Sequence, residues 1–238
     1  MGRLDDRVVI ITGAGRGAGR SMAQLLAAEG AAVVLVARTR SDLEAVAREI
    51  ELDGGRALAV PADVADETQV GEMVGAAAHA FGRIDALVND AGIGIHGPVE
   101  TYPTEDWNAT LATNLTGVFF CCRAVLPVMR AQRRGNIITI ASGAGKQGFP
   151  NLAAYCASKF GVIGFSQALA EEVGDDGIKV SVILPGTIAT AFGGRDRTAV
   201  RAAGRKALEP EDVAQAVLYL LTQPETAWTA EMNLWPFK

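Results

Sequence analysis

The sequence predicts an α/β fold, a doubly wound (Rossmann) sheet of seven mostly parallel strands with helices on both faces. Short runs rich in Val, Ile and Leu alternate with helical segments along the chain, and such runs are typical of strands buried on both faces of a parallel sheet. A glycine-rich segment directly follows the first run. The 238 residues contain no repeat, linker or low-complexity tract, so we expect one domain spanning residues 1–238.

The first half of the chain alternates strand and helix regularly. The expected strands are near-continuous in small and branched apolar residues, and Ser41 has the character of an N-cap for the second helix. Strands are expected at 7–12, 31–37, 57–63 and 84–89, and helices at 21–29, 41–52 and 67–81.

The second half is richer in helix. It begins with a long apolar helical stretch, and strands and helices alternate after it, so that right-handed crossovers complete the doubly wound sheet. Helices are expected at 104–133, 152–173 and 210–222, and strands at 135–142, 178–185 and 231–235.

Composition excludes several classes of partner. The net charge of −5 argues against nucleic acid, which requires a basic face. The longest purely apolar runs, such as 31–37, are too short to cross a bilayer. The N-terminus lacks the basic and apolar pattern of a signal peptide, and Asp6 breaks the myristoylation signal. Three cysteines form no disulfide framework, and the adjacent Cys121 and Cys122 have no matching pair of metal ligands. We therefore expect a cytoplasmic protein with no metal.

The segment TGAGRGAG, residues 12–19, joins the first strand to the first helix. Glycines there allow a sharp turn and a close approach of the backbone to a pyrophosphate, whose charge the positive helix end would meet. Two spacings fit: G-x-G-x-x-A through Gly13, Gly15 and Ala18, and T-G-x-x-x-G-x-G through Gly13, Gly17 and Gly19. The strand–turn–helix context favours dinucleotide binding over a turn without a ligand.

The second spacing resembles the short-chain dehydrogenase/reductase family, in its single-domain branch that includes 3-oxoacyl-(acyl-carrier-protein) reductase-like carbonyl reductases. Later motifs follow in that family's order, and the ordered set is specific although each motif alone is weak. They are Asp63-Val64, the NDAG segment 89–92, Asn114, Ser142, Tyr155-x-x-x-Lys159 and Pro185-Gly186.

The sequence departs from the family pattern at two places. Asp90 replaces the second Asn of the usual Asn-Asn-Ala-Gly segment, which braces the centre of the sheet beside the cofactor in relatives. The C-terminal tail, WTAEMNLWPFK, lacks the glycine-rich ending of many relatives. Cofactor binding is expected to survive the first change. Because of the second change, the resemblance does not predict the structure of the C-terminal edge or the way in which subunits assemble.

The resemblance implies a catalytic set of Asn114, Ser142, Tyr155 and Lys159. A phenol has a pKa near 10, and Lys159 one helical turn away would lower that pKa so that Tyr155 can act as general acid and base. Ser142 would hold the carbonyl oxygen of a substrate. By resemblance, Lys159 also binds the nicotinamide ribose and Asn114 holds a proton-relaying water.

The sequence also predicts an NADP(H) site with NADP(H) preferred over NAD(H). An NAD enzyme of this fold has an acid at the end of the second strand, whereas this strand is followed by Arg38, and Arg16 stands inside the glycine segment. Two guanidiniums would suit a 2′-phosphate. The expected cofactor-binding residues are Gly13, Gly15, Arg16, Gly17, Ala18, Gly19, Arg38, Asp63, Val64, Asn89, Ala91, Gly92, Tyr155, Lys159, Pro185, Gly186, Ile188 and Thr190.

Several alternatives remain open at this point. The polar segment 193–205 corresponds in position to the family's substrate-covering loop, and it is equally an ordinary charged loop. His96 is either a surface residue or a residue near the substrate entrance.

A non-catalytic dinucleotide sensor or scaffold is the alternative function, although such proteins typically lose the Tyr or the Lys. Relatives also predict a homodimer or homotetramer, while the small-molecule carbonyl or alcohol substrate stays unidentified.

Overall fold

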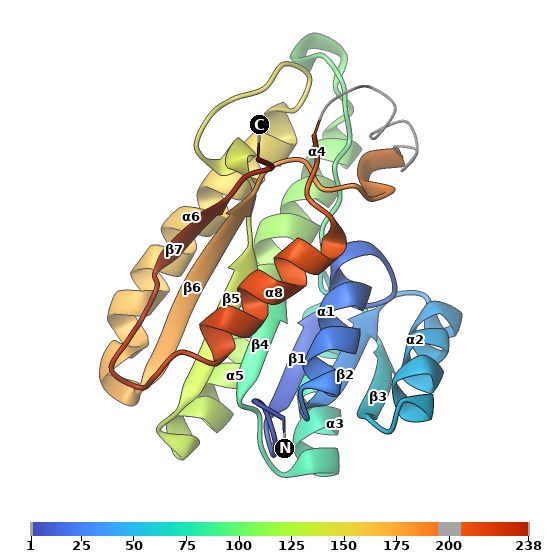
Figure 1. Cartoon of the computed structure of the whole chain (residues 1–238). Helices are drawn as coiled ribbons and strands as arrows, with labels where there is room; N and C mark the ends of the chain where they lie inside the picture. The colour runs from blue at the N-terminus through green and yellow to red at the C-terminus, as the bar shows by residue number, and fades with distance from the viewer. Residues whose placement is uncertain (1, 195–205, 238) are drawn as a thin grey trace.

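A computed structural model describes residues 2–194 and 206–237 and contains a seven-stranded sheet of order β3-β2-β1-β4-β5-β6-β7 (Figure 1). All six neighbouring pairs are parallel. The predicted doubly wound sheet is therefore confirmed, with no antiparallel pair in it. The strands are β1 Val8–Thr12, β2 Ala32–Ala37, β3 Arg56–Pro61, β4 Ala86–Asn89, β5 Gly135–Ile140, β6 Ile178–Pro185 and β7 Glu231–Leu234.

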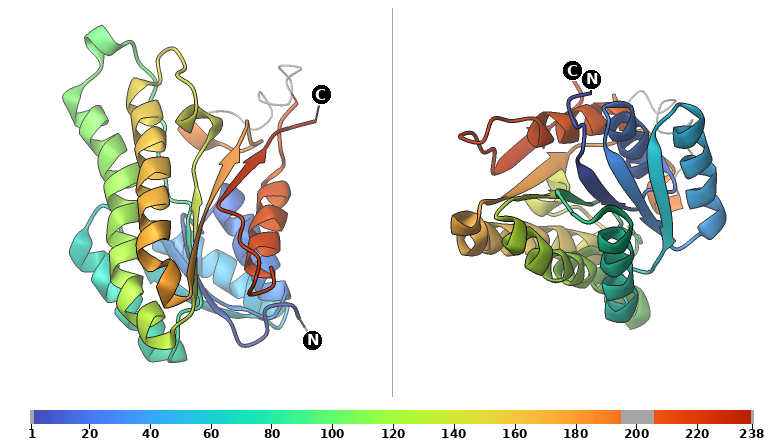
Figure 2. Two further views of the ribbon diagram at one scale, coloured as in Figure 1. Left: turned by 90° about the vertical axis from the view of Figure 1, so that its left-hand side faces the viewer. Right: turned by 90° about the horizontal axis from the view of Figure 1, so that it is seen from below.

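Helices cover both faces of the sheet, as the two perpendicular views in Figure 2 show. One layer contains α1, α2 and α8, and the other contains α3, α5 and α6. Their bounds are α1 Gly17–Ala28, α2 Arg40–Leu52, α3 Glu67–Phe81, α4 Thr104–Leu111, α5 Gly117–Gln132, α6 Ala153–Val173 and α8 Pro210–Leu221.

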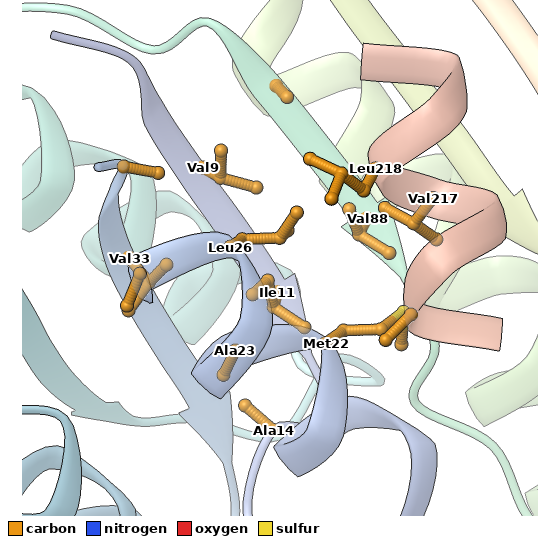
Figure 3. Packing of buried hydrophobic residues seen from close by; sticks show 14 of the residues in the cluster. Val9, Ile11, Ala14, Met22, Ala23, Leu26, Val33, Val88, Val217 and Leu218 are labelled. Atoms are coloured by element: carbon orange, nitrogen blue, oxygen red, sulfur yellow. The ribbon is translucent and has the colours of Figure 1, made fainter. Parts of the chain in front are cut away.

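Strand β1 shows why the central strands are apolar throughout. Val9 and Ile11 pack under α1 and α8 in one core (Figure 3), whereas Val8 and Ile10 pack in the core on the opposite face. Side chains of a strand alternate between its two faces, so a strand covered on both sides buries every residue. The continuous Val and Ile pattern follows from this double cover.

Two predicted helix starts differ from the structure. Helix α1 begins at Gly17, inside the glycine segment, rather than at Ser21. Helix α2 begins at Arg40, with Thr39 at the N-cap position and no side-chain capping bond, so the predicted Ser41 cap is wrong. The glycine segment thus supplies the first residues of α1, and α2 begins one residue before the predicted cap.

The predicted helix 104–133 is interrupted by a π-helical turn, Ala112–Thr116, between α4 and α5. By length and composition the stretch Thr104–Gln132 could cross a membrane, but core helices satisfy the same criteria. One side of α5 packs against the sheet through buried residues that include Cys121 and Cys122. This packing accounts for part of its apolar composition, and the rest lies on its outer side, where Phe119 is exposed.

Candidate active site

A cavity of about 1700 Å³ lies along the carboxyl ends of the central strands. In doubly wound sheets this edge is where ligands bind. The cavity brings together most of the predicted site residues from loops that are far apart in the sequence. Those lining it are Gly13, Gly15, Arg16, Gly17, Ala18, Arg38, Asp63, Val64, Ala91, Gly92, Ser142, Tyr155, Lys159, Pro185, Gly186, Ile188 and Thr190.

The glycine segment forms a tight cradle between β1 and α1. Gly13 and Gly17 have φ angles of 75° and 58°, which L side chains rarely adopt. A Cβ at Gly13 would lie 3.0 Å from the Ala91 nitrogen, and one at Gly19 would lie 2.2 Å from the Gly13 carbonyl oxygen. Gly19 therefore packs behind the cavity wall and does not line it.

The N-terminal end of α1 is suited to an anion. Arg16 at the N-cap position makes no side-chain capping bond, and the first turn contains no acidic residue. The amides of the first helical turn and the helix dipole together favour a pyrophosphate at such an end. The cradle and the helix end thus fit a dinucleotide.

Two predicted site residues, Asn89 and Asn114, lie behind the cavity wall. The Asn89 Nδ2 lies 3.5 Å from the Cys122 Sγ. Asn114, only 1% exposed, sits in the π-helical turn. Its Nδ2 donates to the Ile93 carbonyl at 2.9 Å and to the Ser158 Oγ at 3.1 Å, while its Oδ1 accepts from the Ile93 amide at 2.8 Å.

The Asn114 side chain therefore clamps the segment after β4 to α6. π-Helical turns of this kind are often found at functional sites. Because both polar ends of the side chain already bond protein groups, the water relay implied by the resemblance stays a prediction.

Ser142, Tyr155 and Lys159 meet where β5 ends and α6 begins. The Ser142 Oγ accepts from the Ala144 amide at 3.1 Å. The Lys159 Nζ donates to the Ile140 carbonyl at 2.8 Å and lies 5.7 Å from the centre of the Tyr155 ring. Burial lowers the pKa of Lys159 to about 8, against the opposing effect of Asp90. Lys159 thus remains largely protonated at neutral pH, beside the phenol.

The two arginines predicted to bind a 2′-phosphate both line the cavity. The side chain of Arg38 is 69% exposed, and its Nη1 lies 4.0 Å from the Asp63 Oδ2. A contact this long and exposed is weak. The guanidinium can therefore turn to an incoming anion at little cost.

The cavity also contains residues that the sequence did not single out as site residues. Phe149, Phe192 and Trp235 add aromatic surface, and the Phe192 ring centre lies 5.8 Å from that of Tyr155. Asp90 lines the cavity next to Ala91. No spacing in the sequence would have placed Trp235 beside residues about a hundred positions earlier.

The open alternatives resolve only in part. His96 lines the cavity and is exposed. The proposed covering loop 193–205 falls mainly on residues outside the described ranges, and its first residues, Gly193 and Gly194, border a smaller hollow beside His96. Within the described ranges, no group of three His, Cys, Asp or Glu side chains could hold a metal ion.

The chain belongs to the short chain dehydrogenase family, whose sequence profile matches residues 7–200. It is an oxidoreductase of that family. It is 39% identical over 237 residues to 3-oxoacyl-[acyl-carrier-protein] reductase of Synechocystis, covering 96% of this chain and 94% of the relative.

Solved structures agree with this assignment. A metagenomic short-chain oxidoreductase in complex with NADP has a TM-score of 0.88 at 36% identity, over 99% of this chain and 100% of the other. Levodione reductase has a TM-score of 0.89 at 35% identity, over 98% and 96% of the two chains.

Proposed function

We propose that this protein is an NADP(H)-dependent oxidoreductase that interconverts a carbonyl group and a secondary alcohol. The observation that carries the proposal is that Ser142, Tyr155 and Lys159 line the same cavity as the N-terminal end of α1. That arrangement would place a dinucleotide and a proton donor side by side. It favours catalysis over the sensor or scaffold alternative, which does not require this triad.

Each residue of the triad has a distinct part in the proposed reaction. NADP(H) supplies or accepts the hydride when bound. Tyr155 delivers a proton to the carbonyl oxygen in reduction and removes one in oxidation. The Lys159 ammonium, held by the Ile140 carbonyl, favours the phenolate by its charge. Ser142 stabilises the oxygen as its charge changes.

The remaining features follow from the same proposal. One sheet bears both the nucleotide cradle and the triad, so we treat residues 1–238 as one domain. The buried, unpaired state of all three cysteines suits the reducing cytoplasm. The substrate is a small molecule, and a screen should include a 3-oxoacyl thioester and levodione, after the two relatives described above.

The first test replaces Tyr155 by Phe. We expect turnover to fall by about 10²–10⁴-fold because the proton donor is lost, while NADPH affinity stays nearly unchanged. Steady-state rates with the substrates found in that screen measure turnover, and NADPH titration followed by fluorescence measures cofactor affinity. Tyr219→Phe on the exposed outer side of α8 is the matched control. Activity of Tyr155→Phe within a few-fold of wild type contradicts the assignment.

The second test concerns the cofactor. Each charge-assisted hydrogen bond contributes about 1.5–3 kcal/mol, so loss of one should weaken NADPH binding by about tenfold to a hundredfold. We expect Ala37→Asp combined with Arg38→Leu to shift preference towards NADH, since a carboxylate repels the phosphate. Dissociation constants of both cofactors decide the matter. A wild type that binds NADH as tightly as NADPH defeats the NADP(H) preference.

A further inference from the structure

Asp90 places an acidic side chain at the point where the nucleotide cradle meets the catalytic lysine. It follows β4 directly and lines the cavity. Its backbone is held in place, because the Thr12 Oγ1 accepts from the amides of Asp90 at 3.0 Å and Ala91 at 3.1 Å. The carboxyl position is therefore determined by the core and not by a mobile loop.

The Asp90 carboxyl points at the N-terminal end of α1. A Cβ built on Gly19 would lie 2.9 Å from the Asp90 Oδ2, and the nearby Gly19 amide lowers the pKa of the carboxyl group. Gly19 is the third residue of α1. Asp90 thus lies against the first turn of α1, whose residues Gly17 and Ala18 line the cavity where a pyrophosphate would bind.

Few groups balance this charge. Two groups lower the pKa of Asp90, namely the Lys159 ammonium on α6 and the Gly19 amide on α1. Thr12 on β1 contributes only its neutral hydroxyl. The other ionisable side chains that line the cavity have no resolved effect on it. They are Arg16 and Arg20 at the start of α1, Arg38, Asp63 and His96 on loops, Asp42 on α2, Tyr155 on α6 and Glu211 on α8.

A dinucleotide changes this balance. Its pyrophosphate would bring negative charge to the helix end that Asp90 already contacts, and like charges at such range repel strongly in a partly desolvated site. Proton uptake by the carboxyl removes the repulsion. Burial already raises the pKa of Asp90 to about 7, so the proton is available near neutral pH.

We propose that Asp90 couples cofactor binding to proton uptake: the fraction of Asp90 that is ionised in the free enzyme, as the partner of Lys159, takes up a proton when the dinucleotide binds. The inference rests on the proposed NADP(H) function. The Asn that relatives usually carry at this position has nearly the same shape as Asp but cannot titrate. The variant Asp90→Asn therefore removes the ionisable group while it keeps the shape of the side chain.

Calorimetric titration of NADPH into the whole protein at pH 7 measures the uptake directly. Buffers of low and high ionisation enthalpy, phosphate and Tris, give the number of protons exchanged. We expect wild type to take up as much as about half a proton more than Asp90→Asn, since about half of Asp90 is ionised near its pKa. The difference between the proteins cancels protons exchanged by the 2′-phosphate, which titrates near pH 6.

A second measurement uses affinity. Between pH 6 and 7.5 the affinity of wild type for NADPH should fall about threefold to fivefold more than that of Asp90→Asn. The pH range ends at 7.5, below the pKa of Lys159, so that Lys159 stays largely protonated throughout the measurement. Asp42→Asn, which removes a carboxyl on α2 from the same cavity, should keep the wild-type proton uptake.

Three results overturn the inference: equal proton uptake in wild type and Asp90→Asn, loss of uptake in Asp42→Asn instead, or an affinity difference that is constant at every pH. If the variant does not fold, the same titration of wild type with NADH, which lacks the 2′-phosphate, overturns the inference when no buffer dependence appears. These results leave the proposed function standing, whereas absence of NADPH binding defeats the proposed function itself.

Discussion

Burial shifts the ionisation of two neighbouring side chains in opposite directions. The pKa of Asp90 is raised to about 7 from an ordinary 3.8, and that of Lys159 is lowered to about 8 from 10.5. Desolvation disfavours the charged form of each group, while their mutual attraction offsets part of the cost. The folded protein therefore binds more protons at Asp90, and fewer at Lys159, than the unfolded chain does.

The stability of the protein should depend on pH accordingly. Between pH 4 and 7 the folded state holds the Asp90 proton more firmly than the unfolded state, so this carboxyl contributes less stability as pH rises through that window. Asp90→Asn lacks this dependence. We expect its melting temperature relative to wild type to increase from pH 5 to pH 7.5, below the range where Lys159 acts oppositely. A parallel decline of both proteins would refute the assignment.

Among the elements, the C-terminal strand bears directly on the site. A Cβ at Gly143 would lie 2.7 Å from the Trp235 Cη2, and one at Gly186 would lie 2.9 Å from its Cε3. The indole thus packs on the residues that follow Ser142 and Pro185. An ion pair of 2.7 Å between Lys146 and Glu231, and a 2.8 Å bond from the Gly186 amide to the Leu234 carbonyl, hold the strand there.

We expect Trp235→Ala to change substrate selection more than cofactor binding. Removing the indole widens the cavity beside Ser142, so kcat/KM for a bulky ketone should rise by about tenfold relative to a small one, the scale of one or two pocket methylenes. Phe237→Ala is the control, since that side chain is 91% exposed and does not line the cavity. An equal loss for all substrates, or weaker NADPH binding, would mean that Trp235 only supports the fold.

At the scale of the whole molecule, the outer helices leave aromatic surface uncovered. Phe119 on α5 and Phe160 on α6 are 39% and 48% exposed, and Phe119 contacts Phe165 edge-on at 6.2 Å. Figure 2 shows the two helices running side by side on the outside of the sheet. Such a patch typically marks an interface between proteins, which agrees with the predicted homo-oligomer.

We expect sedimentation at micromolar concentration to show a dimer or tetramer, and Phe160→Glu to shift it to a smaller species. Burial of a Phe side chain contributes about 1.5–3 kcal/mol, and a two-fold axis uses each residue twice. Leu52→Glu, on the exposed end of α2, is the control that should not dissociate. A stable wild-type monomer would defeat the prediction.

The sheet and most of the candidate site could be predicted because their signals are local. Strands such as β1 and β2 are buried on both faces and so read as unbroken apolar runs. The cradle residue Gly13 needs a backbone that only glycine adopts easily. Tyr155 and Lys159 stand one turn apart on one helix, so their proximity is already implied by their spacing.

Other features depend on contacts between distant segments, which no spacing encodes. The π-helical turn at Asn114 is stabilised by hydrogen bonds to Ile93 and Ser158. Trp235 reaches the cavity because β7 pairs with β6. The pKa of the Asp90 carboxyl depends on groups from α1 and α6. The amino-acid order thus determines which residues can adopt the backbone of a tight turn and which side chains carry an ionisable group. Long-range packing determines which of them meet, since burial and electrostatic coupling exist only once the sheet has assembled.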